Sequence, residues 1–357
     1  MTPDFPPRHG GIQVLLHRLV LHTEFASRVV TLTSPGAKEF DAEQSFDLRR
    51  VDWVPRSRKA SFLRLNAAAV REARRFRPDA VLSGHIVTAP AAWAIRTTLG
   101  PRAVQYLYAD EVRAAPRLCR FALRDASAVV VVSRHADALA RRFGTERRRI
   151  HRIPPGVDLP ADPPPAQRAE RRTLLTVARL DDEYKGHDVI LRALPLIKRD
   201  VPDVRWVVLG DGALLPRLKR QAAEEGLDGA ACFLGGVSDA ERDHWYRTAH
   251  VFVMPSRLPV RGGGEGFGIV YLEAGARGLP VVAGNVGGAL DAVVDGETGV
   301  LIDPTNPTAV AAAAVDLLRS PERAARMGRN GAARAQRFAW PIIARQVENV
   351  ILETLDA

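Results

Sequence analysis

Short apolar runs alternate along the whole chain with longer segments whose apolar residues recur at helical spacing. A short apolar run between turn residues is typical of a buried strand, and the helical spacing predicts a helix with one face in a core. Repeated alternation of the two indicates parallel sheets built from βαβ units. In the first half, the expected strands are residues 29–32, 80–82, 103–107 and 128–132.

The same alternation restarts after a proline-rich segment. Residues 153–165 contain Ile-Pro-Pro-Gly-Val-Asp followed by four further prolines, and this density of breakers indicates a linker. Beyond it, helices are expected between the strands and from Thr308 nearly to the end, with a break near Trp340 and Pro341. The expected strands of this half are residues 173–177, 204–209, 231–233, 251–253, 280–283 and 300–302.

The predicted fold is α/β, with two Rossmann-like doubly wound domains that face each other across a cleft. A chain of 357 residues exceeds what one hydrophobic core usually serves. The first domain is expected to span residues 1–155 and the second residues 156–339. Ligands of doubly wound sheets bind at the carboxyl ends of the strands, so the active site is expected in the cleft.

The composition is that of a globular protein, with 46% apolar and 6% aromatic residues. No segment reaches the roughly 20 uninterrupted apolar residues that a membrane-spanning helix needs. Residues 1–11 contain no apolar stretch behind a basic start, so no secretion signal is predicted and a cytoplasmic protein is expected. Cys119 and Cys232 lack a partner motif, which favours two reduced thiols over a disulfide or a metal site.

Positive charge is concentrated in the first half. Residues 1–155 carry 27 Lys and Arg against 14 Asp and Glu, a net charge of +13, whereas residues 156–357 carry 24 against 27, a net charge of −3. A field of this sign attracts phosphate-bearing acceptors, anionic lipid headgroups or nucleic acid, although an arginine-favouring genome would give the same balance. Nucleic acid is disfavoured, because the arginines lie in helical patterns without interleaved aromatic side chains to stack on bases.

A glycine-rich segment at residues 261–274 carries the densest candidate chemistry. It reads Arg-Gly-Gly-Gly-Glu-Gly-Phe-Gly-Ile-Val-Tyr-Leu-Glu-Ala. Glycine lets the backbone approach a ligand, and the amides of residues 266–270 are expected to open a helix whose positive end favours phosphate or sugar hydroxyls. Glu265 precedes this helix and Glu273 lies inside it, so the spacing predicts both carboxylates on nearly the same face. One is expected to meet a sugar and the other a ribose diol. A plain turn is the alternative.

Glu265 and Glu273 match the E-x7-E motif, and the chain resembles the retaining glycosyltransferases of family 4. The opening motif and the triple-glycine loop are most similar to phosphatidylinositol mannoside mannosyltransferases. The resemblance implies the GT-B architecture, with the terminal helix at residues 340–357 crossing back onto the first domain. The other motifs that carry it are Asp4-Phe5-Pro6-Pro7-Arg8-His9-Gly10-Gly11-Ile12, Ile153-Pro154-Pro155-Gly156-Val157-Asp158, Val177-Ala178-Arg179-Leu180, Lys185-Gly186, Leu209-Gly210-Asp211-Gly212, Gly278-Leu279-Pro280-Val281-Val282-Ala283 and Gly287-Gly288.

The resemblance also implies a role for individual residues. The amides of Gly10 and Gly11 would contact the donor diphosphate, Arg179 and Lys185 would neutralise it as it leaves, and Glu265 would contact the transferred sugar. Fixed cations can stabilise a departing diphosphate in place of a metal, and the sequence has no Asp-x-Asp pair to hold one, so neither a metal nor a cofactor is expected. The full set of predicted donor-binding residues is Gly10, Gly11, Arg179, Lys185, Gly266, Phe267, Gly268, Ile269 and, at the ribose, Glu273.

One segment departs from the family pattern. Family members commonly carry a His in a Thr-His-Gly-x-Glu type of segment after the fourth strand of the first domain, and Tyr108 stands at that position here. Three interpretations follow: Tyr108 or Asp110 does the local work, with Asp110 as an acceptor-orienting base; the acceptor differs; or the chain is catalytically weak. His9 and His85 lie near predicted strand ends, although a lone His is more often structural than catalytic.

The start of the chain departs as well. In relatives a short strand precedes the Phe-Pro-Pro-x-x-Gly-Gly loop, and here only Met1, Thr2 and Pro3 precede Asp4. A missing inner strand leaves the backbone groups of its neighbours unpaired. Either translation begins upstream or the first sheet is rearranged. An intact mass of the natural protein with no extra N-terminal residues would exclude the first explanation.

Together these features predict a retaining hexosyltransferase. It is expected to move a hexose, with mannose from GDP-mannose as the first candidate, from a nucleotide-diphosphate sugar to an acceptor hydroxyl. The resemblance implies front-face attack in which the donor diphosphate takes the proton. A phosphoinositol lipid acceptor, with peripheral contact to the inner face of the plasma membrane, fits the closer resemblance and the basic first half; a soluble secondary metabolite fits the Tyr108 segment. The alternatives are a nucleotide-sugar epimerase and a catalytically degenerate protein that binds a sugar nucleotide or an anionic lipid.

Overall fold

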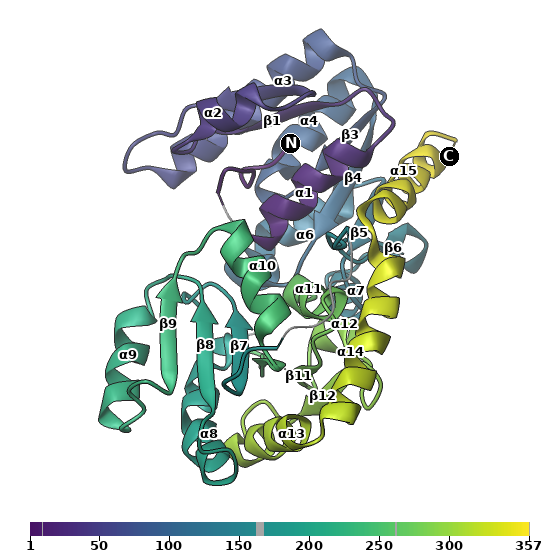
Figure 1. Cartoon of the computed structure of the whole chain (residues 1–357). Coiled ribbons are helices and arrows are strands. Elements are labelled where there is room, and N and C mark those ends of the chain that lie inside the picture. Colours follow the sequence, from purple (N-terminus) through teal and green to yellow (C-terminus); the bar gives the residue numbers. More distant parts are fainter. Residues whose placement is uncertain (9, 162–167, 261–262, 357) are drawn as a thin grey trace. The chain divides into compact units, whose positions relative to one another are not determined.

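The computed structural model describes residues 1–8, 10–161, 168–260 and 263–356, and the chain within it divides into two units (Figure 1). The first unit comprises Met1–Gly156 and Trp340–Ala357, and the second comprises Val157–Ala339. The second unit is therefore a continuous piece of chain inserted between the two pieces of the first. Each unit contains parallel strands joined by helices.

The second unit contains one sheet of six strands in the order β12-β11-β10-β7-β8-β9. Its first strand along the chain, β7 (Thr173–Val177), lies inside the sheet and pairs in parallel with β8 (Arg205–Leu209) and β10 (Val251–Met254). These strands are apolar runs buried on both faces, as expected for parallel strands between helix layers. The remaining elements are β9 (Ala231–Gly235), β11 (Val281–Gly284), β12 (Gly299–Ile302), α8 (His187–Asp200), α9 (Leu215–Glu224), α10 (Asp239–Thr248), α11 (Ile269–Ala276), α12 (Ala289–Ala292), α13 (Pro307–Arg319) and α14 (Pro321–Ala335).

The first unit contains two separate parallel sheets, β1-β2 and β3-β4-β5-β6. Alanine-rich helices cover them, and small side chains on α3 and α4 pack against β1 and β3. The strands are β1 (Arg28–Leu32), β2 (Asp47–Val51), β3 (Ala80–Ser83), β4 (Arg102–Leu107), β5 (Ala128–Val131) and β6 (Ile150–Arg152). The helices are α1 (Gly11–His22), α2 (Ala37–Ala42), α3 (Arg58–Phe76), α4 (Ala89–Leu99), α5 (Asp110–Ala114), α6 (Pro116–Asp125), α7 (Arg134–Arg142) and α15 (Trp340–Asp356).

Met1 and Thr2 lie between the facing edges of β1 and β3. The Met1 amine donates to the Leu82 carbonyl oxygen at 2.9 Å, and the Met1 carbonyl accepts from the Gly84 amide at 2.9 Å. On the other side, the Thr2 amide donates to the Val30 carbonyl at 3.1 Å. Within the described residues the sheet is interrupted at this place, where the sequence predicts a missing inner strand.

The terminal helix α15 belongs to the first unit. The Glu348 carboxylate on this helix accepts hydrogen bonds from the Thr23 hydroxyl at 2.7 Å and from the Glu24 amide at 2.6 Å. Trp340, at its start, packs over Gly156, where a Cβ would lie 2.3 Å from the indole ring. The C-terminal segment therefore completes the unit that the N-terminal segment begins.

The strands predicted from apolar runs are all present, with ends that differ by one or two residues. Helix α7 follows β5, and the Ser133 hydroxyl caps it by accepting from the Ala136 amide at 3.1 Å. The strands β2 and β6 were not predicted. Both are partly exposed edge strands, and β2 reads Asp-Leu-Arg-Arg-Val, so neither has an apolar run.

Candidate active site

The loops that follow the strands of the second unit gather three of the predicted site residues at one sheet edge. Arg179 and Lys185 lie between β7 and α8, and Glu265 lies between β10 and α11. Since β7 and β10 are parallel neighbours, their carboxyl ends meet at the same edge. This is the edge at which doubly wound sheets bind ligands.

Lys185 and Glu265 form an ion pair at this edge, with Nζ of the lysine donating to Oε2 of the carboxylate. Only 14% of the lysine side chain and 12% of the glutamate side chain are exposed. The Lys185 ammonium also lies 5.1 Å from the centre of the Tyr184 ring. A mostly buried pair of this kind holds one positive and one negative group in fixed positions, 80 residues apart in sequence.

The loop that carries Arg179 is held by close backbone packing. Gly210 has a φ of +138°, and a Cβ there would lie 1.9 Å from the Ala178 carbonyl oxygen. The Leu180 amide donates to the Asp211 carbonyl at 2.8 Å, which ties the two loops together. Glycine is required here because the neighbouring loop occupies the space of a side chain.

The backbone around Glu265 is held in the same way. The Gly288 amide donates to the Glu265 carbonyl at 2.9 Å, and a Cβ on Gly288 would lie 2.3 Å from the Gly266 carbonyl oxygen. On the lysine side, Gly186 has a φ of +82°, and a Cβ there would lie 2.3 Å from the Pro255 carbonyl oxygen. The glycines of these motifs therefore position the ion pair by letting loops pack against one another.

The expected start of helix α11 is corrected by the structure. The helix begins at Ile269, with Gly268 as its N-cap at a φ of +87°, so Gly266 and Phe267 precede it. Glu265 is also outside the helix, and helical periodicity therefore does not relate it to Glu273. Phe267 is buried, with its ring 6.0 Å from that of Phe338. Local structure after the glycines is thus a loop and not the first helical turn.

Glu273 lies on α11 and accepts a hydrogen bond from the Tyr246 hydroxyl of α10 at 2.8 Å. Burial and the nearby Glu273 carboxylate raise the pKa of Tyr246 well above its usual range, so the phenol stays a donor. Arg277 lies 5.4 Å from the centre of the same ring. The contact to a ribose predicted for Glu273 stays a prediction.

Arg179 is the predicted diphosphate ligand that the structure does not bring to the ion pair. Its side chain is 61% exposed, and its Nη2 lies 4.0 Å from Asp182 Oδ2. Among the described contacts, Lys185 and not Arg179 pairs with Glu265. The role of Arg179 therefore stays a prediction.

In the first unit, Gly11 begins helix α1 and Gly10 is its N-cap. Gln13, one turn later, donates to Asp4 Oδ1 at 3.3 Å and fixes the loop before the helix. His9 lies outside the described residues. The predicted contacts of the Gly10 and Gly11 amides with a diphosphate are not tested by this arrangement and stay predictions.

Tyr108 is buried at the end of β4, and its hydroxyl donates to the Gly84 carbonyl at 3.0 Å. Burial raises the pKa of this phenol well above its usual range, so it acts as a neutral donor to backbone. Asp110 begins α5 and lies 3.7 Å from Arg113, with 40% of its side chain exposed. His85 accepts from the Val87 amide at 3.2 Å and caps a short helix, which is a structural role.

Both units match families of known proteins. Residues 9–160 match the family described as Glycosyltransferase Family 4, and residues 161–334 match the family described as Glycosyl transferases group 1. A GDP-mannose-dependent alpha-(1-6)-phosphatidylinositol monomannoside mannosyltransferase of Mycolicibacterium smegmatis is 36% identical over an alignment that covers 92% of this chain and 91% of the relative. The chain is a family 4 glycosyltransferase.

A further relative is a D-inositol 3-phosphate glycosyltransferase of Streptomyces avermitilis, 33% identical over 63% of this chain and 51% of the relative. Among solved structures, Anabaena HepE in complex with UDP and glucose superposes with a TM-score of 0.79 at 20% identity, covering 98% of this chain and 97% of HepE. Sucrose-phosphate synthase of Thermosynechococcus elongatus gives a TM-score of 0.79 at 22% identity, covering 96% and 93%. These likenesses confirm the predicted fold, two parallel-sheet α/β domains of the GT-B type.

This glycosyltransferase also contains a buried carboxyl that was not predicted as a site residue. Glu111 follows β4, and its Oε2 accepts from the Tyr108 amide at 2.8 Å, while Oε1 has no hydrogen-bond partner among the described residues. Burial, reinforced by the charges of Asp110 and Asp4, raises the pKa of Glu111 to about 8. The signal was available, because Glu111 occupies the Glu position of the Thr-His-Gly-x-Glu type of segment.

Proposed function

We propose that this glycosyltransferase transfers mannose from GDP-mannose to an acceptor hydroxyl with retention of configuration and without a metal ion. The Lys185–Glu265 pair at the carboxyl edge of the second sheet carries the proposal. It offers a cation for a diphosphate and a carboxylate for a sugar in one fixed place. The choice of donor is supported by the M. smegmatis relative, whose name states dependence on GDP-mannose.

The roles of Lys185 and Glu265 follow from the charges that develop on the donor during transfer. As the bond between the anomeric carbon and the diphosphate oxygen breaks, negative charge accumulates on the diphosphate and positive charge on the sugar ring. Lys185 stabilises the first, and a fixed cation in a mostly buried site does so more effectively than water. Glu265 accepts hydrogen bonds from sugar hydroxyls and holds the ring in place.

Retention is explained by attack on the face from which the diphosphate leaves. The acceptor oxygen forms the new bond to the anomeric carbon, the old carbon–oxygen bond breaks, and the hydroxyl proton passes to the departing diphosphate. No protein nucleophile is needed, so two carboxylates spaced as in glycoside hydrolases are not required. In this scheme Lys185 takes the place of a metal ion at the diphosphate.

A phosphoinositol lipid is the proposed acceptor. The name of the M. smegmatis relative states a phosphatidylinositol monomannoside acceptor, and residues 1–155 carry a net charge of +13 from 27 Lys and Arg against 14 Asp and Glu. No helix among the described residues is long and apolar enough to cross a bilayer. Contact with a lipid headgroup would therefore come from the basic surface of the first unit, attracted to anionic lipid.

A soluble hydroxyl-bearing metabolite is the second candidate acceptor. The observation that favours it is the replacement of the family His by Tyr108, whose hydroxyl is committed to the Gly84 carbonyl. A phenol used in this way leaves no imidazole at the place where an acceptor is expected to bind. The two acceptors are distinguished by offering each with the same donor.

The donor is tested by thermal shift with mannose and glucose donors carrying GDP, UDP, ADP or TDP. A donor that binds the folded chain stabilises it by mass action, by about 2.7 kcal/mol at a concentration 100 times its Kd. GDP-mannose is expected to give the largest increase in melting temperature. A flat response to every donor would contradict the proposed function.

Turnover is tested with GDP-mannose and vesicles that contain phosphatidylinositol, with phosphatidylcholine vesicles as the control. A mannosylated lipid is expected only in the first case, with activity unchanged by a chelator. GDP-mannose alone serves as a second control, because an epimerase would alter the donor without any acceptor. Tight binding of the donor with no product from lipid or metabolite acceptors would instead indicate a binding protein.

A further inference from the structure

Tyr246 of helix α10 and Glu273 of helix α11 form a contact that has no part in the proposed transfer step. The Tyr246 hydroxyl donates to Oε2 of the glutamate at 2.8 Å. The tyrosine is only 1% exposed, whereas the glutamate is partly buried. Among the described residues, this phenol is the only hydrogen-bond donor to the Glu273 carboxylate. One carboxylate oxygen is therefore held by the protein, and the other is left for a ligand.

The ring of Tyr246 has little freedom to move. It stacks on Phe252 of β10, with the ring centres 6.0 Å apart and the planes at 28°. Phe252 in turn meets Tyr271 of α11 edge to face at 5.9 Å, and the Tyr271 hydroxyl donates to the Met254 carbonyl at 2.8 Å. Close packing of aromatic rings fixes side-chain positions in a protein core. The phenol hydroxyl therefore has a fixed place and needs no rearrangement to hold the glutamate.

Arg277, directly after α11, joins the same two helices. Its Nε donates to Asp243 Oδ1 of α10 at 2.6 Å, and its Nη1 donates to the Glu273 carbonyl at 3.3 Å. The Arg277 side chain is mostly buried, so these bonds are shielded from water. The backbone that carries Glu273 is thus attached to α10 without the phenol. It follows that the phenol hydroxyl acts on the carboxylate more than on the helix.

The two glutamates of the glycine-rich segment are held by donors of different charge. Glu265 pairs with the Lys185 ammonium, whereas Glu273 accepts from a phenol. Burial raises the pKa of Tyr246 well above its usual range, so the phenol is neutral near neutral pH. A neutral donor orients a carboxylate without cancelling its charge. Glu273 therefore stays a strong acceptor for hydroxyl groups, because hydrogen bonds to a charged acceptor are the stronger ones.

A ribose diol suits this arrangement. Its 2′- and 3′-hydroxyls are adjacent donors, and a carboxylate offers two oxygens with about four acceptor positions. Rotation of a carboxyl about its last bond is only weakly restricted, since a torsion between sp³ and sp² carbons has broad minima. The hydrogen bond from Tyr246 restricts that rotation. It thereby fixes the plane in which Oε1, and the remaining positions of Oε2, accept hydrogen bonds from a ligand.

We propose that Tyr246 is a positioning residue, which orients the Glu273 carboxylate to accept hydrogen bonds from the ribose diol of the donor nucleotide. This inference rests on the proposed function and deepens it, because it assigns the recognition of the nucleotide's own sugar. The ribose is remote from the bond that breaks, so the contact is made equally before and during transfer. Loss of the phenol hydroxyl is therefore expected to raise KM for the donor about tenfold and to leave kcat within about twofold.

The test measures the affinities of GDP and of 2′,3′-dideoxy-GDP by isothermal titration calorimetry. Tyr246→Phe removes only the hydroxyl and keeps the stacked ring. It is expected to weaken GDP binding about tenfold and binding of the dideoxynucleotide by less than about twofold, because only GDP carries the diol. The parent enzyme is expected to bind GDP more than about tenfold tighter than the dideoxynucleotide.

Thr248→Val is the matched control, since it removes a hydroxyl from the same helix. The Thr248 hydroxyl donates to the His244 carbonyl within α10 at 2.9 Å. Both affinities of this variant are expected to stay within about twofold of those of the parent. Glu273→Gln and its combination with Tyr246→Phe complete the set. The combined variant is expected to bind GDP about as weakly as Glu273→Gln alone, because the two side chains act through one contact.

Two results would overturn the inference while the proposed function stands. An equal loss of affinity for both nucleotides in Tyr246→Phe would mean that the phenol only supports the fold. GDP binding by Tyr246→Phe as tight as that of the parent would mean that the hydroxyl has no part in binding. A parent enzyme that binds neither nucleotide would instead contradict the proposed donor, and the inference with it.

Discussion

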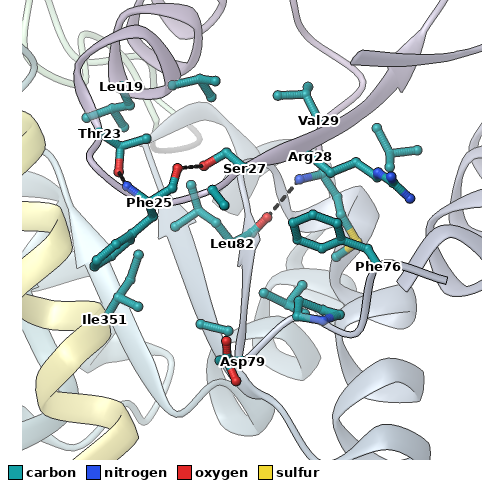
Figure 2. A pocket seen from close by; sticks show the side chains of 18 of the residues that line it. Leu19, Thr23, Phe25, Ser27, Arg28, Val29, Phe76, Asp79, Leu82 and Ile351 are labelled. Carbon is teal, nitrogen blue, oxygen red and sulfur yellow. Dashed lines mark hydrogen bonds between the residues drawn. The ribbon is translucent and has the colours of Figure 1, made fainter. Parts of the chain in front are cut away.

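The two units of this glycosyltransferase differ at the place that an inner strand occupies in the second unit. In the second unit β7 fills that position and pairs with a strand on either side. In the first unit a cavity of about 700 Å³ lies between the facing edges of β1 and β3, and Met1 and Thr2 are part of its lining (Figure 2). The first sheet is consequently divided in two.

The difference teaches what an inner strand contributes to a site. The loop after β7 carries Lys185 at a fixed place, because its strand is anchored on both sides and its glycines pack against neighbouring loops. The corresponding loop of the first unit, before α1, is anchored by the bonds of two residues and by the contact of Gln13 with Asp4. The loop that carries Lys185 is therefore the better anchored of the two loops.

The largest expected effect comes from placing a charge on β7. Leu175 is fully buried, so Leu175→Asp buries an unpaired carboxylate and is expected to unfold the second unit, with a loss of more than about 4 kcal/mol. Leu82→Asp on β3 is the matched change beside the cavity, where the side chain is partly exposed, and a much smaller loss is expected. The stability losses of the two variants are measured by urea unfolding, with hydrogen exchange used to monitor each unit separately. Equal losses would mean that the cavity does not loosen the first sheet.

The next effect concerns the site that the anchored loop carries. Lys185→Gln removes the proposed diphosphate cation and is expected to lower kcat by about 10²- to 10³-fold, and Glu265→Gln is expected to lower activity without unfolding the chain. Arg217→Gln is the control, since its exposed pair with Glu183 lies beside the same loop and contributes about 0–1 kcal/mol. Initial rates with GDP-mannose measure all three. Activity near that of the unchanged enzyme in Lys185→Gln would remove the lysine from the mechanism.

Smaller losses of stability are expected when a glycine in each of the two units is replaced by alanine. Gly288→Ala forces a Cβ against the Gly266 carbonyl, and a loss of about 1–3 kcal/mol is expected together with weaker donor binding. Gly10→Ala meets only the end of the flexible Gln13 side chain, so its effect on stability is expected to be smaller. Thermal unfolding measures the pair. A larger loss for Gly10→Ala would show that the first loop is the more tightly packed.

The last effect is a pH dependence that comes from a group of the first unit. Folding raises the pKa of Glu111 to about 8 from an ordinary value of 4.5, so the folded chain keeps a proton that the unfolded chain releases. The stability contributed by this group is present below pH 4.5 and is lost as pH rises towards 8. Glu111→Gln lacks this loss, so its stability relative to the parent is expected to increase from pH 5 to pH 8.

The buried amine of Met1 titrates in the same interval with the opposite sign, because its pKa falls from 8.0 to about 5 on folding. Comparison of Glu111→Gln with its parent cancels that contribution, since both proteins carry the amine. Unfolding at a series of pH values measures the difference. A difference that does not vary with pH would show that Glu111 is ionised in the folded chain.

The strands of both units could be predicted because buried parallel strands leave an unmistakable apolar run, as in β10. The edge strand β2 could not, because an edge strand exposes half of its surface and two of its five residues are arginines. Helix α11 was predicted to start too early, since a sequence does not show that Gly266 and Phe267 pack as a loop. Hydrophobic periodicity therefore predicts buried strands well, but it does not predict how loops pack against one another.

The site was predicted through family resemblance more than through spacing. The contact of Lys185 with Glu265 joins residues 80 positions apart, which no local pattern specifies. The glycines of residues 261–274 were expected to let a ligand approach, and nothing in the sequence showed that Gly210 and Gly288, in other motifs, lie against neighbouring loops. Glu111 was overlooked because burial and its effect on the pKa depend on tertiary packing.

The return of α15 to the first unit has a consequence for how the polypeptide matures during synthesis. The second unit leaves the ribosome as one uninterrupted piece, whereas the first waits for the helix that follows Ala339. At about 5–20 residues per second, a ribosome needs roughly 10–40 s to travel from Gly156 to the end of that helix. Throughout that interval the N-terminal half lacks the partner of Thr23 and Glu24, so chaperones have a window in which to engage it.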